Sequence, residues 1–207
     1  MKTLSRLILA GVAGSATLSL AAASLPDNVV NCQPNTGCVS RKMFDRNYKV
    51  LTTPRAEVMV SISTEGDYTR ADISILNNDG FPVKITPDDF RVEVVSPKPH
   101  VLAYVAPASL QGVAPEPPTP EPPPPAAKPD PTAPINIDEL YAAKKKRLAQ
   151  QEAFDRAVAQ HNLAPTSIEP NQVVRGRVYF ERDKRATQVN LTIPIAGVVY
   201  QFPYTLQ

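Results

Sequence analysis

Apolar and polar residues alternate with a period of two along two separate parts of the chain. In the first part the pattern covers residues 58–62, 71–75 and 90–94, with a short run at 81–85 and a weaker one at 101–105. In the second part it covers residues 174–180, 189–193 and 198–204. This period is typical of strands with one buried face. We therefore predict about eight strands, five before a gap and three after it.

The gap contains two segments of different character. Eleven of the twenty residues 115–134 are proline. Because proline has no backbone N–H to donate, this stretch predicts an extended linker. Residues 137–162 then predict a helix, with Asn136 as its N-cap and Pro165 beyond its end. We expect its thin apolar stripe to bind a partner through Leu140, Tyr141, Leu148, Phe154 and Val158.

Neither strand group is large enough to bury the apolar face of a sheet by itself. We therefore predict a mainly β fold: an immunoglobulin-like antiparallel β-sandwich interrupted by a Pro-rich linker and one long α-helix. The expected order is a signal peptide (1–23), an N-terminal arm with a disulfide (24–54), the first part of the sandwich (55–110), the linker (111–135), the helix (136–163) and the second part of the sandwich (164–207).

The first residues have the pattern of an export signal. Lys2 and Arg6 precede an apolar run at residues 7–13, and small residues lead to a cleavage motif that ends at Ala23. The alternative is a retained membrane anchor over residues 4–25, whose length is close to the ~20 residues of a spanning helix. We expect an exported protein, periplasmic or extracellular, and leave its association with the cell envelope open.

The two cysteines agree with export. An even count in an exported chain favours a disulfide, and Pro34 and Gly37 favour a turn between Cys32 and Cys38. We predict a structural Cys32–Cys38 bond.

The net charge excludes one class of partner. Lysine and arginine total 22, and aspartate and glutamate total 20. The excess is Lys2 and Arg6, so the chain without its signal is neutral. A neutral chain argues against binding nucleic acid by charge. The cluster at residues 144–147 spreads around the helix, because four consecutive residues cover about 300°. This spread favours a solvated surface, and proximity to a membrane or cell wall stays open.

Two stretches resemble a known family. They are residues 71–80 followed by Thr-Pro-Asp-Asp-Phe at 86–90, and Ile-Glu-Pro-Asn-Gln at 168–172 followed by a strand with Gly176. Together they are similar to the telokin-like, immunoglobulin-type domains of unknown function in bacterial secreted proteins and lipoproteins. The resemblance covers about residues 57–105 and 168–204, and it implies a sandwich without catalytic residues. The Pro-rich insert and the helix depart from the family pattern.

The sequence contains no H-E-x-x-H, G-x-S-x-G or glycine-rich phosphate motif. We expect a non-enzymatic binding or structural module of the bacterial cell envelope, without cofactor or metal. It would be an accessory subunit that contacts envelope proteins through the helix or a sheet edge, and self-association stays open. One alternative is a membrane-tethered, envelope-spanning spacer. Another is a metal-binding protein or enzyme that uses Asp88, Asp89 and His100.

Overall fold

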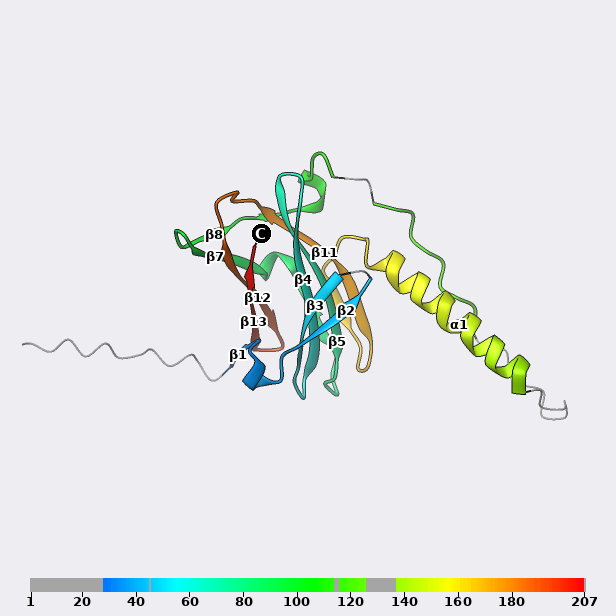
Figure 1. Ribbon diagram of the computed structural model, residues 1–207. Coiled ribbons are helices and arrows are strands. Elements are labelled where there is room, and N and C mark those ends of the chain that lie inside the picture. The colour runs from blue at the N-terminus through cyan, green and yellow to red at the C-terminus, as the bar shows by residue number, and fades with distance from the viewer. Residues whose placement is uncertain (1–27, 45, 114–115, 126–136, 207) are drawn as a thin grey trace, which may run out of the picture.

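The alternating stretches form two packed sheets in the computed structural model, which describes residues 28–44, 46–113, 116–125 and 137–206 (Figure 1). Within these residues, the six-stranded sheet has the order β2 (Val39–Met43), β3 (Arg46–Thr52), β4 (Ala56–Glu65), β5 (Tyr68–Asn77), β11 (Val173–Glu181) and β9 (Tyr104–Val105). The five-stranded sheet, counted over the same residues, has the order β1 (Val29–Asn31), β13 (Val198–Thr205), β12 (Gln188–Ile195), β7 (Arg91–Ser96) and β8 (His100–Leu102). A separate ladder pairs β6 (Val83–Ile85) with β10 (Thr166–Ile168).

Strands from before and after the insert pair directly. β11 is antiparallel to β5 along residues 173–181, and β12 is antiparallel to β7. Alternate apolar residues of both sheets meet in one core, whose largest fully buried side chains include Phe90, Phe180, Tyr200 and Phe202. The predicted mainly β sandwich with one helix is confirmed.

The N-terminal region differs from the expected arm. Residues 39–43 and 46–52 form β2 and β3, which extend the six-stranded sheet beyond β4. Tyr48 and Val50 pack with Met59 on the outer face of this sheet, whereas Leu51 belongs to the main core. Because β3 buries side chains on both faces, its sequence lacks the period-two alternation that identified the other strands.

Residues 101–105, predicted as one strand, divide between the two sheets. His100–Leu102 forms β8 and pairs with β7, whereas Tyr104–Val105 forms β9 and pairs with β11. The chain therefore crosses from one sheet to the other at Ala103, and it closes one end of the sandwich.

The remaining predicted elements are an extended linker, a helix and a disulfide. The described parts of the linker, residues 111–113 and 116–125, contain neither helix nor strand. Helix α1 (Ile137–Val158) ends four residues before the predicted end at residue 162. Its proposed N-cap, Asn136, lies outside the described residues. Cys32 and Cys38 form the predicted disulfide, with their Cα atoms 4.9 Å apart and Cys32 buried.

Candidate functional site

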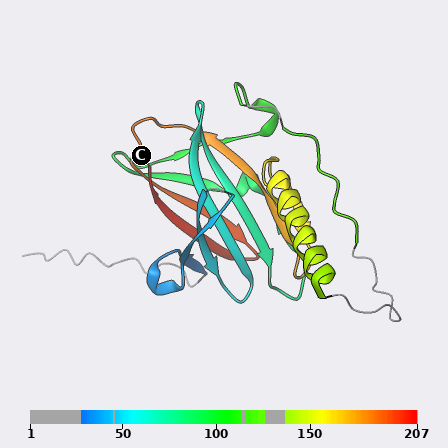
Figure 2. The same cartoon turned by 45° about the vertical axis from the view of Figure 1, so that its right-hand side comes forward.

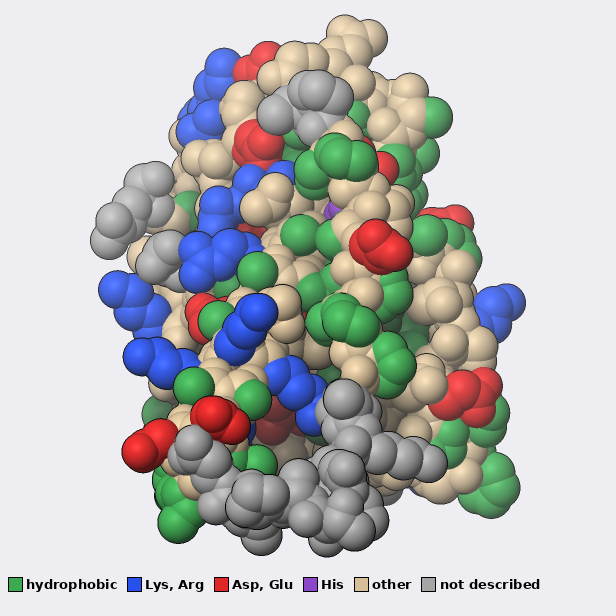
Figure 3. Space-filling view, turned by 90° about the vertical axis from the view of Figure 1, so that its right-hand side faces the viewer, with side chains coloured by type: hydrophobic (Ala, Val, Ile, Leu, Met, Phe, Trp, Pro, Cys, Tyr) green, Lys and Arg blue, Asp and Glu red, His purple; other side chains and the backbone are tan. Residues whose placement is uncertain are grey.

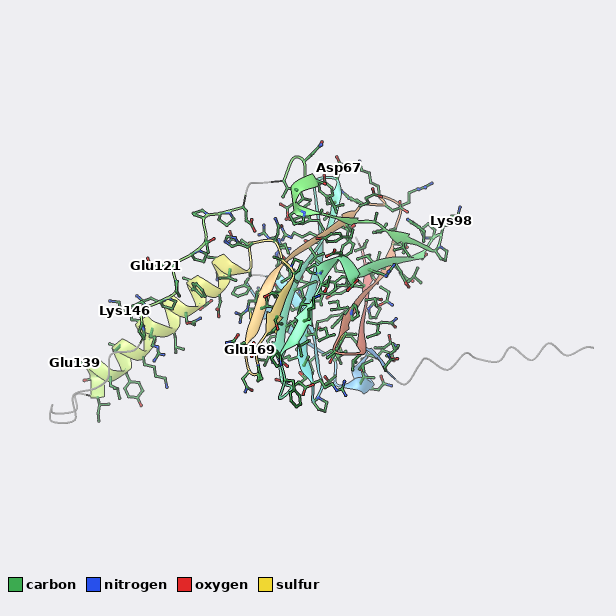
Figure 4. The ribbon with its side chains drawn as sticks, turned by 180° about the vertical axis from the view of Figure 1, so that it is seen from behind. Asp67, Lys98, Glu121, Glu139, Lys146 and Glu169 are labelled. Carbon is green, nitrogen blue, oxygen red and sulfur yellow. A yellow bond between two sulfur atoms is a disulfide. The ribbon has the colours of Figure 1, made fainter. Side chains whose placement is uncertain are left out.

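Helix α1 extends away from the sandwich (Figures 1 and 2). None of its residues is buried. Glu139 lies at the outer end of the helix and Lys146 near its middle, and Glu121 of the proline-rich segment lies alongside (Figure 4). We call α1 together with residues 116–125 the projection. It is the part of the described structure that offers side chains furthest from the folded core.

The chain that leaves α1 is attached to β11 by backbone hydrogen bonds. The N–H of Arg177 donates to the carbonyl of His161, and the N–H of Leu163 donates to the carbonyl of Arg177, each at 2.8 Å. Gly176 permits this approach, because a Cβ there would lie 2.8 Å from the Cα and backbone N of Leu163. Leu163 itself joins the main core. The helix therefore ends at residue 158 because the following residues complete the edge of a strand.

Polar side-chain contacts reinforce this attachment. Nη1 of Arg175 lies 3.1 Å from Oδ1 of Asp155, which comes from the last turn of α1. Oε1 of Glu116 accepts a hydrogen bond from the N–H of Asn162 at 2.5 Å and lies 3.3 Å from Nδ1 of His161. Because Glu116 belongs to the proline-rich segment, both described ends of the insert meet at the base of the projection.

The structure divides the five predicted partner-binding residues into two groups. Phe154 and Val158, near the base, are half-buried. Leu140, Tyr141 and Leu148 expose 62%, 68% and 62% of their surface. Leu140 and Val158 are eighteen residues apart, which is five turns of 3.6 residues, so they share one helix face. The apolar residues of this face are therefore half-buried near the sandwich and exposed further out.

The proline-rich segment covers one flank of this helix. Residues 120–125 and the helix residues Gln150, Ala153 and Phe154 line one groove. Pro124 and Pro125 line a second groove with Leu140 and its neighbours on the same flank. Neither groove includes Tyr141 or Leu148. The segment therefore supports the helix from one side and leaves these two side chains free for contact.

A buried polar cluster lies below the base, on the outer face of the six-stranded sheet. Oδ2 of Asp72 lies 2.9 Å from Nη1 of Arg46 and 3.2 Å from Nη2 of Arg70. Oδ1 of Asp72 lies 3.6 Å from Nε of Arg177. Glu65 contacts Arg70 and accepts a hydrogen bond from the hydroxyl of Tyr179 at 3.3 Å. This cluster joins β3, β4, β5 and β11 beneath the end of the helix.

Burial shifts the titration of this cluster. It raises the pKa of Asp72, and the positive charges of Arg46 and Arg177 oppose that shift. Burial, with a smaller effect of Glu65, raises the pKa of Tyr179 to about 12. The period-two pattern of residues 71–75 and 174–180 predicts that Asp72, Arg177 and Tyr179 lie on the outer face of the sheet. It does not show that this face is covered. The pairing of opposite charges could have indicated this cluster, because Asp72 and Arg177 lie opposite each other on neighbouring strands.

The residues of the metal or enzyme alternative lie at different places. Asp88 and Asp89 are exposed and precede the first residue of β7, whereas His100 pairs with Val94 near its end. Nε2 of His100 lies 3.6 Å from Oδ2 of Asp183. Among the described residues, no group of three or more His, Cys, Asp or Glu side chains is arranged to hold a metal ion. Asp88, Asp89 and His100 therefore do not form one metal site in the described geometry.

No helix in the described part of the chain is both long enough and apolar enough to cross a bilayer.

Comparisons with known proteins do not identify a family for this chain. The sequence matches no protein-family profile and no curated protein. A crystal structure described as a "putative lipoprotein (ycdA)" from Bacillus subtilis is similar with a TM-score of 0.42 and 13% identity. The similarity covers 75% of this chain and 38% of that chain. The resemblance to telokin-like domains stays a prediction.

Proposed function

We propose that this chain is an exported, non-enzymatic binding module of the cell envelope, which contacts a partner protein through its projecting helix. The sandwich serves as the scaffold, as the resemblance to telokin-like domains of secreted proteins suggests. The observation that carries the proposal is a helix face whose apolar residues are half-buried at Phe154 and Val158 and exposed at Leu140, Tyr141 and Leu148. An isolated surface helix gains nothing from such exposure, whereas a helix that docks in a groove uses side chains spaced in this way.

The helix is a better contact element than the sheet edges. At one edge of the six-stranded sheet, β2 carries Arg41 and Lys42, and charged residues at an edge disfavour the addition of another strand. The other edge strands, β9, β8 and β1, have only two or three residues each. A sheet edge therefore offers a partner few unpaired backbone groups.

The charge of α1 favours a different protein over a second copy of this chain. Residues 144–147 are Lys-Lys-Lys-Arg and lie at the middle of the helix. Antiparallel pairing of two copies about the helix centre would bring these clusters together, and like charges repel. A partner with acidic residues around an apolar groove fits the same surface without this repulsion.

The pattern of residues 1–23 supports export, and intact mass tests it. The chain is expressed with its own leader and recovered from the periplasm or medium. We expect a soluble product that begins at Ser24 and is two hydrogens lighter than its reduced form, because of the Cys32–Cys38 bond. A membrane-bound product that retains Met1 would instead favour the tethered spacer.

Partner binding is tested by comparing two matched triple variants in an envelope pull-down. In one variant serine replaces the exposed apolar residues of the helix, Leu140, Tyr141 and Leu148. In the control serine replaces exposed apolar residues of the sandwich, Phe81, Val95 and Val101. We expect the loss of captured partner, relative to the unchanged protein, to be at least ten times larger for the helix variant than for the control. Equal capture by the two variants would refute the assignment of the helix.

A further inference from the structure

A small pocket lies between the base of the helix and the outer face of the six-stranded sheet. Its volume is about 220 Å³. This is less than a typical pocket for a drug-sized ligand, which holds about 300 Å³ or more. The pocket therefore suits a single small chemical group. It is lined by Phe44, Arg46, Tyr48, Asp72, Arg156, Ala159, Gln160 and Arg177.

The charged groups at this place do not balance. Asp72 faces Arg46, Arg70 and Arg177, and Arg70 also contacts Glu65. Three guanidinium groups thus share two carboxylates, which leaves one positive charge in the described cluster. Arg156, at the rim, already pairs with Glu152 at 3.5 Å and adds no excess. Lys and Arg side chains gather on this side of the molecule, which Figure 3 shows.

One donor at the pocket has no acceptor. Nε of Arg177 is buried and makes no hydrogen bond within the described residues, although it lies 3.6 Å from Asp72. A buried donor without an acceptor costs free energy, and an oxyanion would satisfy it. The guanidinium group is planar and always charged, and it matches the two oxygens of a carboxylate.

The walls of the pocket select among anions. The rings of Phe44 and Tyr48 belong to the lining, and the guanidinium of Arg156 lies over the Phe44 ring, 5.9 Å from its centre. An aromatic wall favours a ligand that carries carbon next to its charged group. One excess positive charge matches a monoanion, whereas a phosphate dianion would exceed it. One excess positive charge beside an aromatic wall therefore favours a carboxylate attached to a short carbon chain.

We propose that this pocket binds a single carboxylate group between Arg46, Arg156 and Arg177, with its carbon chain against Phe44 and Tyr48. The carboxylate belongs either to a small organic acid or to the end of a peptide. In either case the ligand contacts both the sheet and the end of α1. Its binding would join the projection to the sandwich, independently of whether the helix binds a protein.

The test is an NMR titration of the purified, ¹⁵N-labelled protein with sodium propionate. Sodium chloride at equal ionic strength and sodium phosphate are the reference titrations. We expect a saturable shift of the Arg177 Nε–H signal with propionate, and a smaller shift or none with phosphate. A peptide with a free C-terminal carboxylate, compared with its amide, then distinguishes the two sources. Saturation by the acid peptide alone would assign the site to peptide ends, and saturation by propionate would include small acids.

Two variants of the same helix provide the control. Arg156→Gln removes a guanidinium from the rim, where its side chain is 48% exposed, so the fold should tolerate it. Arg147→Gln makes the same change on the outer part of α1. We expect Arg156→Gln to weaken binding about tenfold and Arg147→Gln to leave it unchanged, because a charged hydrogen bond is lost only in the first. Any of three results would overturn the proposal. These are no saturable shift with either propionate or the acid peptide, equal binding by the two variants, and stronger binding of phosphate than of propionate.

Discussion

Gly176 gives the sharpest test of how the projection is attached. An added Cβ would lie 2.8 Å from both Cα and N of Leu163, and 3.0 Å from its Cβ. The obstructing atoms are mainly backbone, so no flexible side chain can move away. Gly176→Ala must therefore separate the segment at residues 161–163 from β11, or displace both.

The cost follows from the contacts at this site. Forcing one additional carbon into a packed position costs about 1–3 kcal/mol. The two backbone hydrogen bonds that join His161 and Leu163 to Arg177 contribute about 0.5–1.5 kcal/mol each if they are lost instead. Either route predicts a loss of about 1–3 kcal/mol, which lowers the melting temperature by roughly 2–12 °C for a chain of this size.

Urea unfolding measures this loss, and Gly80→Ala is the matched control. A Cβ at Gly80 meets no atom within 4 Å, and the residue does not need a positive φ. We expect the control to change the free energy of unfolding by less than about 0.5 kcal/mol. Hydrogen exchange of the Leu163 and Arg177 amides should accelerate only in Gly176→Ala. Equal stability of the two variants would refute the tight attachment of the chain at Gly176.

Three further perturbations test the sandwich and its polar cluster. Asp72→Asn should lower the free energy of unfolding in urea by about 3 kcal/mol, because it leaves the facing arginines without their carboxylate. The pKa of Tyr179 is 10.0 in the unfolded chain and about 12 in the folded protein. Its contribution to the free energy of unfolding is therefore fully present below pH 10 and is lost as the pH rises toward 12. Tyr179→Phe should remove one tyrosinate from the absorbance transition near pH 12. Reduction of Cys32–Cys38 should cost about 2 kcal/mol, measured as a lower melting temperature with reductant, because the bond closes a short loop. An unchanged stability in urea, absorbance transition or melting temperature would contradict the respective prediction.

The sequence predicted most strands because their outer faces stayed polar. β4, β5, β7, β11, β12 and β13 carry clear period-two patterns, and all six are strands of the structure. β3 was missed because Tyr48 and Val50 are buried on the outer face while Leu51 is buried on the inner one. Periodicity identifies a strand only when the residues of one of its faces are polar and those of the other are apolar.

The candidate site was only partly predictable for a related reason. Helical spacing identified Leu140, Tyr141 and Leu148 as one face, since that pattern is local. The exposure of this face depends on where the chain attaches, which Gly176 and Leu163 decide through contacts that local periodicity does not encode. The arginine pocket likewise needs β3, β5, β11 and α1 to meet. Contacts of this kind appear in a sequence only as isolated charges at outward positions.

Site-specific photocrosslinking tests directly whether the exposed helix face contacts a partner protein. A photoreactive phenylalanine derivative replaces Tyr141 in one variant and Phe81 in the other, both in cells that export the chain with its own leader. The two positions are matched, because both are exposed aromatic residues, at 68% and 76%. We expect a covalent adduct with another protein at position 141 and not at position 81. No adduct at position 141, or the same adduct at both positions, would contradict it.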